Sequence, residues 1–142
     1  MGLKSPKVEV CKALHDRLVN DLKYQTVAVP VYVDIAPKNL GVDTHVLIWG
    51  YIDNDNGNKL DYGLTSSVNV EIYTKSDDSV KHEAVVNSLK GLIHTKKVEH
   101  LSMTSFNNSV LKEPSYQSLT ELNEEGQIFR TILKYELIVE QK

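Results

Sequence analysis

Apolar and polar residues alternate between Ser66 and Lys75, and this is the clearest pattern in the chain. Val68, Val70 and Ile72 share one face of that segment, and a period of two is typical of a half-buried strand. The next four residues, 76–79, are serines and aspartates that suit a helix start. Apolar residues then recur at roughly helical spacing: Val80, Ala84, Leu89, Leu92 and Ile93. The pattern predicts a strand that leads directly into an amphipathic helix.

A similar helical spacing predicts a first helix over Lys7 to Lys23. Pro6 stands where the first turn of a helix tolerates proline. The apolar positions of this helix are Val8, Cys11, Leu14 or His15, Leu18 and Leu22.

The segment from Val27 to Pro37 is short and bounded by prolines, which favours an edge strand or a loop. Residues 39–41 read as a turn. Thr44 to Asp53 is a strand candidate, and the polar turn at 53–58 contains Asn-Gly, the strongest short hairpin signal. The strand at 66–75 is therefore expected to pair antiparallel with the strand that precedes it.

The last third of the chain predicts a strand over Val98 to Phe106, a long polar connection over 107–126, and a final strand over Gln127 to Glu140. A connection of about twenty residues is typical of a functional or mobile loop. The last strand has one face for the core and a second, mixed face suited to a subunit contact. The core-facing residues are Phe129, Thr131, Leu133, Tyr135, Leu137 and Val139.

This order of elements predicts an α+β fold, a small antiparallel β-sheet with two main helices packed on it. A length of 142 residues favours a single domain over 1–142. The net charge of −3 argues against general affinity for nucleic acid, which needs basic surfaces. No apolar run approaches the length of a membrane span, no signal peptide is expected, and the single cysteine excludes an internal disulfide.

Few residues suggest chemistry. The turn at 53–58 fails the calcium-loop pattern, because its glycine comes one place early and position twelve is Leu64. The histidines lack zinc-site spacing and are expected on surfaces or helix faces. Cys11 and His15 lie one helical turn apart, so a nucleophile pair is geometrically possible, although nothing orients it. Phosphate-binding glycine loops and nucleophile elbows are absent. No catalytic, cofactor-binding or metal residue is nominated, and no enzyme activity is expected.

The order of segments resembles the tail terminator, or tail-completion, proteins of long-tailed phages and prophages. The resemblance covers most of the chain and depends on five segments: Val31–Pro37 with its Tyr and Ala-Pro, Val46–Gly50, Val68–Thr74, Leu89–Leu92 and Phe129–Leu137. The chain continues Ala36-Pro37 with Lys38-Asn39, where the commonest form of the family has Gln-Gly.

The resemblance implies a structural role. Members of the family form a hexameric ring on the head-proximal end of the tail tube, stop its polymerisation and present a docking face for the head connector. DNA passes through the lumen without sequence reading, the location is the virion, and assembly takes place in the bacterial host cytoplasm. The long 107–126 connection is the segment expected to order on contact with tube or connector.

Two alternatives remain open at this stage. One is a neighbouring head–tail joining protein. The other belongs to a different class, a small ligand-binding α+β domain, and would need a pocket with converging polar groups. Tyr62, His82, Glu83 and Tyr116 are its candidate residues.

Overall fold

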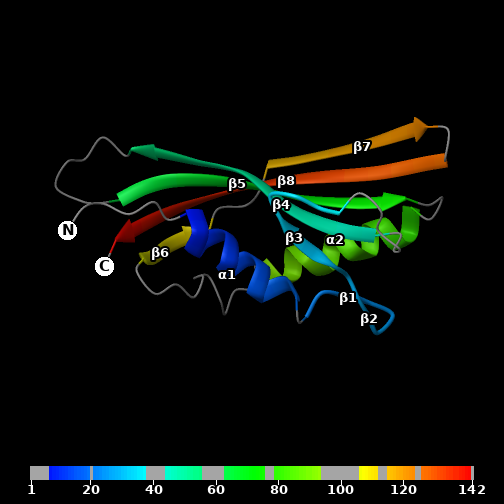
Figure 1. Ribbon diagram of the computed structural model, residues 1–142, viewed down its shortest axis with the longest axis horizontal. Helices are drawn as coiled ribbons and strands as arrows, with labels where there is room; N and C mark the ends of the chain where they lie inside the picture. Colours follow the sequence, from blue (N-terminus) through cyan, green and yellow to red (C-terminus); the bar gives the residue numbers. More distant parts are fainter. Residues whose placement is uncertain are drawn as a thin grey trace.

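The computed structural model describes the backbone in eight segments and the side chains in a smaller set. The backbone segments are residues 7–19, 21–37, 44–55, 63–75, 79–93, 106–111, 115–123 and 126–141. Side chains are described over 7–19, 21–37, 44–52, 66–75, 79–93 and 128–136. These segments form one layer of sheet with two helices against it (Figure 1).

The structure has two helices and ten elements in all among the described residues. They are α1 (Lys7–Val19), β1 (Lys23–Tyr24), β2 (Val27–Ala28), β3 (Val31–Val33), β4 (Thr44–Asp55), β5 (Gly63–Lys75), α2 (Ser79–Ile93), β6 (Phe106–Leu111), β7 (Ser115–Asn123) and β8 (Gly126–Gln141). The α+β prediction is confirmed, as are the two main helices, the β4–β5 hairpin and the long final strand.

The main sheet has the strand order β3-β4-β5-β8-β6, and β7 also pairs with β8. Every pair is antiparallel except β3 with β4, so the expectation of a wholly antiparallel sheet is wrong at one edge. The carbonyl of Pro30, just before β3, accepts a hydrogen bond from Val46 N–H at 2.9 Å. A proline at this place agrees with the predicted edge position of the strand.

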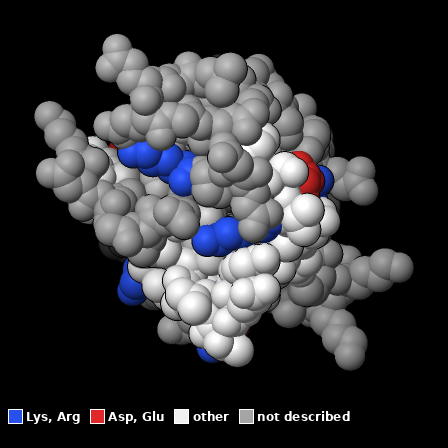
Figure 2. Space-filling model, turned by 90° about the vertical axis from the view of Figure 1, so that its right-hand side faces the viewer, with Lys and Arg blue, Asp and Glu red and all other residues white. Residues whose placement is uncertain are grey.

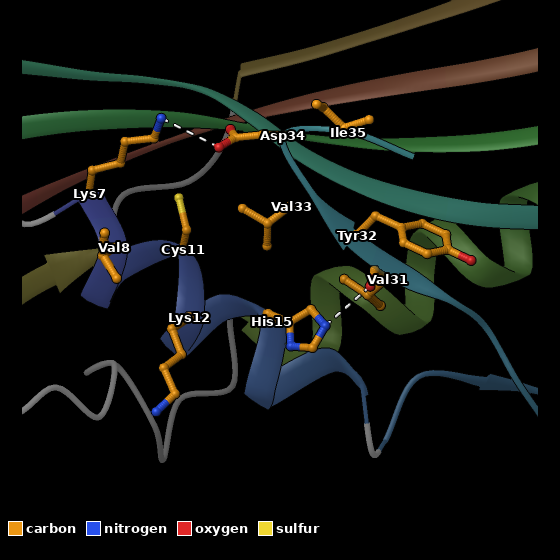
Figure 3. Close-up of a pocket in the computed structure, with 10 residues that line it drawn as sticks. All are labelled: Lys7, Val8, Cys11, Lys12, His15, Val31, Tyr32, Val33, Asp34 and Ile35. Carbon is orange, nitrogen blue, oxygen red and sulfur yellow. Dashed lines mark hydrogen bonds and ion pairs between the residues drawn. The ribbon is translucent and has the colours of Figure 1, made fainter. Parts of the chain in front are cut away.

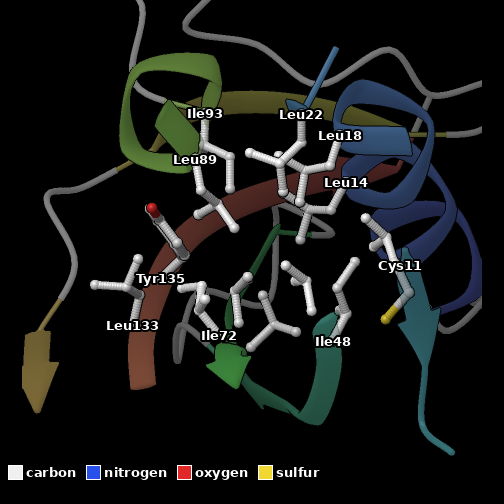
Figure 4. Close-up of a cluster of buried hydrophobic side chains, with 14 of the residues drawn as sticks. Cys11, Leu14, Leu18, Leu22, Ile48, Ile72, Leu89, Ile93, Leu133 and Tyr135 are labelled. Carbon is white, nitrogen blue, oxygen red and sulfur yellow. The ribbon is translucent and has the colours of Figure 1, made fainter. Parts of the chain in front are cut away.

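The core lies between the helices and one face of the sheet (Figure 4). Ile48, Val70 and Leu133 stand side by side on β4, β5 and β8, and none of them is exposed to solvent. Leu14 and Leu89 close over this row from α1 and α2 and are equally inaccessible. The apolar alternation of the two longest strands is therefore the feature that fixes which face of the sheet the helices cover.

Both helices differ in detail from their predictions. The first ends at Val19 rather than Lys23, because the chain leaves the helix in a turn with Asp21 N–H and Leu22 N–H both bonded to Leu18 O. Val8 and Val80, expected on the apolar stripes, are 75% and 74% exposed. Among the other predicted positions, Cys11, Leu14, Leu18, Leu22, Leu89 and Ile93 are buried, as expected. The full buried stripes are Val10, Cys11, Ala13, Leu14 and Leu18 in α1, and His82, Val85, Val86, Leu89 and Ile93 in α2.

The long polar connection predicted for 107–126 is wrong, because the described part of it consists of β6 and β7. β7 pairs with β8 from Ser115↔Lys134 to Asn123↔Gly126. Its polar composition concealed it, since an edge strand is held by backbone hydrogen bonds and needs little apolar surface. The strand predicted at 98–106 falls outside the described residues except for Phe106, which begins β6. The turns at 39–41 and 56–58 and the caps at 76–78 also lie outside them.

The β1–β2 hairpin turns through two residues of positive φ, Gln25 at 48° and Thr26 at 71°. A type I′ turn requires this geometry and normally has asparagine and glycine there. Threonine is β-branched and strained in this region. We therefore expect Thr26→Gly to raise the free energy of unfolding by about 1 kcal/mol, because the relief of strain exceeds the entropy cost of glycine.

Thermal unfolding followed by circular dichroism tests this expectation. Thr26→Val is the matched control, because valine keeps the β-branch and should give no gain. Equal melting temperatures for Thr26→Gly and the unaltered chain would contradict the assignment of strain to this turn.

Candidate functional site

Cys11 and His15, which the sequence placed one turn apart, have separate roles in the structure. Cys11 is 3% exposed on α1, and burial, with a smaller contribution from Asp34, raises the pKa of its thiol to about 11. The thiol is therefore neutral at physiological pH and a poor nucleophile. The His15 ring is directed elsewhere, with Nε2 3.2 Å from Val31 O and Nδ1 3.5 Å from an Asp16 carboxylate oxygen. The two side chains do not form a catalytic pair.

His82 lies inside the protein rather than in a ligand site. It is 3% exposed on the inner face of α2, with Nδ1 2.8 Å from Thr74 Oγ1 and Nε2 2.8 Å from Thr131 Oγ1. The Phe129 ring lies beside it at a centroid distance of 5.7 Å. Thr74 also bonds to Thr44 at 3.2 Å between hydroxyl oxygens. The imidazole thus joins α2 to β5 and β8 through a buried polar chain.

Burial lowers the pKa of His82 below its ordinary 6.5, against a smaller opposing effect of Glu83. The unfolded chain therefore binds more protons than the folded chain just below pH 6.5, and stability is lost as pH falls through that range. We expect the free energy of unfolding, measured by urea titration, to fall between pH 7.5 and 5.5. His82→Gln should flatten this fall, leaving the contribution of His45, whose pKa burial also lowers.

An identical slope in the His82→Gln variant would contradict this source of the pH dependence. His45→Gln is the matched control, because it removes the other described histidine with a lowered pKa and leaves the contacts of His82 in place.

The candidate residues of the ligand-binding alternative do not come together where their side chains are described. His82 points into the core, whereas its neighbour Glu83 is exposed on the opposite side of α2. The side chains of Tyr62 and Tyr116 lie outside the described set, as do His94 and His100. Among the described residues there is no group of three or more potential metal ligands, and neither described helix is long and apolar enough to cross a membrane.

The sheet face that points away from the helices carries an aromatic row across β3, β4 and β5. His45 stands between Tyr32 and Tyr73, with ring centroids 6.2 and 5.0 Å apart. Next to this row the Glu71 carboxylate accepts two hydrogen bonds from Arg130, at 3.0 and 3.3 Å. The Glu71 side chain is only 10% exposed. This ordered ion pair is a structural feature of the sheet face, and it has no adjacent nucleophile among the described residues.

A recess built from described residues lies between α1 and β3 (Figure 3). We call it the α1–β3 groove, with a volume of about 560 Å³. Val33 and Cys11 form its floor, and Val8 and Ile35 stand at its rim with 75% and 81% of their surface exposed. Lys7 and Lys12 approach it from α1, and Lys7 makes an ion pair of 3.4 Å with Asp34. Asp34 balances part of this charge, so the border is weakly basic around an apolar floor, which suits an extended, acidic-apolar protein segment better than a polar metabolite.

The sequence prediction missed this groove. It placed Val8 in the core, and it treated Ile35 only as part of a short bounded segment. The useful signal was the pair of prolines around β3, because they mark an edge strand, and an edge strand leaves one row of backbone groups open.

A second surface lies at the end of the molecule that carries the β1–β2 hairpin and the start of α2. Figure 2 shows that Lys and Arg predominate among the charged residues drawn on this end. Lys81 of α2 lies over the Tyr24 ring at 5.5 Å and so ties the helix to the hairpin. This basic end contrasts with the net charge of −3 and offers a second place for an acidic partner.

Comparisons with known proteins give a match of fold. No family model and no curated protein matches the chain. A solved structure described as the virion of a native gene transfer agent particle contains a chain of similar fold, with a TM-score of 0.75 and 15% sequence identity. The alignment covers 97% of this chain and 99% of that chain. At this identity the match shows that the two chains share a fold over essentially their whole length.

Proposed function

We propose that this chain is a structural subunit of a phage-type virion that caps the head-proximal end of the tail tube as a ring. The observation that carries the proposal is the full-length match to a chain from a virion, which leaves almost no part of either chain unaligned. The pattern of the strands and helices, which resembles tail terminator proteins, supports the same role. In this proposal residues 1–142 form one tail-terminator-like domain, without enzyme activity or cofactor.

A ring needs two different patches on each subunit, which meet by rotation around a closed axis. The sheet supplies two different edges, β3 at one side and β6 with β7 at the other. Copies joined edge to edge would leave the helix layer and the opposite sheet face for other contacts. The partners proposed are therefore further copies in a ring of about six, the tail-tube protein, and the head connector. DNA passes through the lumen without sequence-specific contacts.

The proposed location is the virion, with assembly in the cytoplasm of the bacterial host. The test of the function is tube capping. Tail-tube protein from the same phage or prophage is polymerised with and without the purified chain, and tube length is measured by negative-stain microscopy. A terminator shortens the tubes in proportion to its concentration and appears as a ring at one tube end. Unchanged tubes without end-bound rings would contradict the proposal.

A neighbouring head–tail joining protein is the second candidate, because the structural match is to a virion as a whole and is equally compatible with that position. The two candidates differ in their partner. A pull-down with tail-tube protein in one arm and portal or adaptor protein in the other distinguishes them: a terminator retains the tube protein, and a joining protein retains only the portal or adaptor.

A further inference from the structure

We propose that the α1–β3 groove docks the free edge of β7 from a second copy of this chain, so that copies join head to tail. The inference rests on the proposed ring function and names the surfaces that would build it. Four observations support it: the open edge of β3, the exposed apolar rim, the position of β7 in the sheet, and the charges of the two surfaces.

The outer side of β3 is open at Val33. Val46 N–H bonds to Pro30 O and Asp34 N–H bonds to Ile48 O, in the register Tyr32↔Leu47. Because alternate residues of a strand face opposite sides, Val31 and Val33 face away from β4. Their carbonyls are occupied, by His15 Nε2 and by Ile35 N–H. Val31 is 6% exposed and packs in the core, whereas Val33 is partly exposed. The Val33 N–H has no acceptor among the described residues, so this position of the edge can donate to a carbonyl or carboxylate oxygen.

The rim beside this edge is held in an exposed position by the backbone. Ile35 N–H bonds to Val33 O at 2.8 Å across Asp34, whose φ is +66°. This is a γ-turn with a left-handed centre, an uncommon and strained conformation that tends to occur at binding sites. It turns Ile35 outward to 81% exposure. Val8 faces it across the groove, so two large apolar side chains border one open edge.

β7 is the edge that suits this groove by position. It pairs with β8 on one side, and no described strand pairs with its other side. β3 and β7 therefore lie at opposite ends of one sheet. Pairing β3 of one copy with β7 of the next joins two unlike patches, which is the heterologous contact that a closed ring requires.

Charge and composition favour β7 over other edges of the same chain. β7 contains Glu121 and the apolar residues Leu119 and Leu122, with no lysine or arginine. The groove is bordered by Lys12 and by Lys7, whose charge is partly balanced by Asp34, so its border keeps a net positive charge. β6 contains no charged residue. Two β3 edges facing each other would bring both sets of lysines together, which disfavours a symmetric dimer through this groove.

Sedimentation velocity over a concentration series tests the docking. Ile35→Asp places a negative charge at the rim that opposes Glu121, and it should raise the concentration needed for assembly at least tenfold. Val80→Asp is the matched control, because Val80 is another exposed β-branched residue, 74% accessible, and lies on α2 away from the groove. The control should assemble like the unaltered chain. Equal assembly of the Ile35→Asp variant, or an unaltered chain that stays monomeric throughout, would overturn the inference.

Directed cross-linking tests the pairing itself. In a Cys11→Ala background, whose folding is checked by circular dichroism, Ile35→Cys chains are mixed with chains that carry Leu119→Cys, Thr120→Cys or Glu121→Cys. Oxidation should link the two kinds of chain at one or more of these positions, and neither kind alone should dimerise. Absence of all three mixed links, or efficient linking of Ile35→Cys chains with each other, contradicts β3–β7 docking.

Negative-stain images separate this inference from the proposed function. Closed rings that form regardless of Ile35→Asp would keep the ring function and overturn the groove as its interface. Open filaments that disappear with Ile35→Asp would keep the groove as an interface and overturn the ring.

Discussion

Replacing His82 with phenylalanine is expected to lower the free energy of unfolding by about 2 kcal/mol, because two buried hydrogen bonds are lost and two threonines lose a partner. His82 is 3% exposed and reaches Thr74 and Thr131 at 2.8 Å each. Phenylalanine is close in size, so packing against Phe129 is largely kept and the loss reports on the polar contacts. Equilibrium urea unfolding at pH 7.5 measures the change.

The control for this prediction removes the Thr131 hydroxyl, which bonds to His82. Thr131→Val replaces a buried polar group with an apolar one of the same shape, and in the unaltered background it should be destabilising, because the bond to His82 is lost. In the His82→Phe background, where that bond is already absent, the same change should cost less. If both backgrounds respond equally, the imidazole and the Thr131 hydroxyl are not coupled, and the buried polar chain is not a stabilising unit.

The predictable part of the fold is the part with strong hydrophobic periodicity. β5 and β8 have an apolar face buried by the helices, and burial of one face imposes alternation that can be read directly. The strand β7 was not predicted, because it pairs with β8 through backbone hydrogen bonds, which do not depend on residue type. β3 was recognisable as an edge through its prolines, but its parallel direction is a property of its pairing with β4, which no local pattern records.

The candidate sites were less predictable, for a reason visible at His82 and Ile35. The buried stripe of α2 includes His82 as an inward position. The hydrogen-bond partners of His82 are Thr74 and Thr131, which are 8 and 49 residues away in the sequence and lie on two different strands. The groove depends on Ile35 being turned outward by the positive φ of Asp34. Such tertiary placement of single side chains is not recorded in the local pattern, which predicted neither the burial of His82 nor the exposure of Ile35.

Replacing Arg130 with methionine is expected to lower the free energy of unfolding by about 3 kcal/mol, more than His82→Phe, because it leaves the buried Glu71 carboxylate without this cation. Glu71 is 10% exposed in its side chain and receives both hydrogen bonds of the pair from Arg130. Its cross-strand neighbours are Leu47 and Ile132, which offer no replacement donor from their side chains. Equilibrium urea unfolding measures the loss.

The two partners of this ion pair should not respond alike, and the asymmetry tests the argument. The Arg130 side chain is 28% exposed, so water can solvate it when Glu71→Leu removes its partner, and that variant should lose less stability than Arg130→Met. The double variant should be more stable than Arg130→Met alone, because a leucine between Leu47 and Ile132 replaces the stranded charge with apolar contact. A double variant less stable than either single variant would show instead that the ion pair contributes little and that both side chains act through their aliphatic packing.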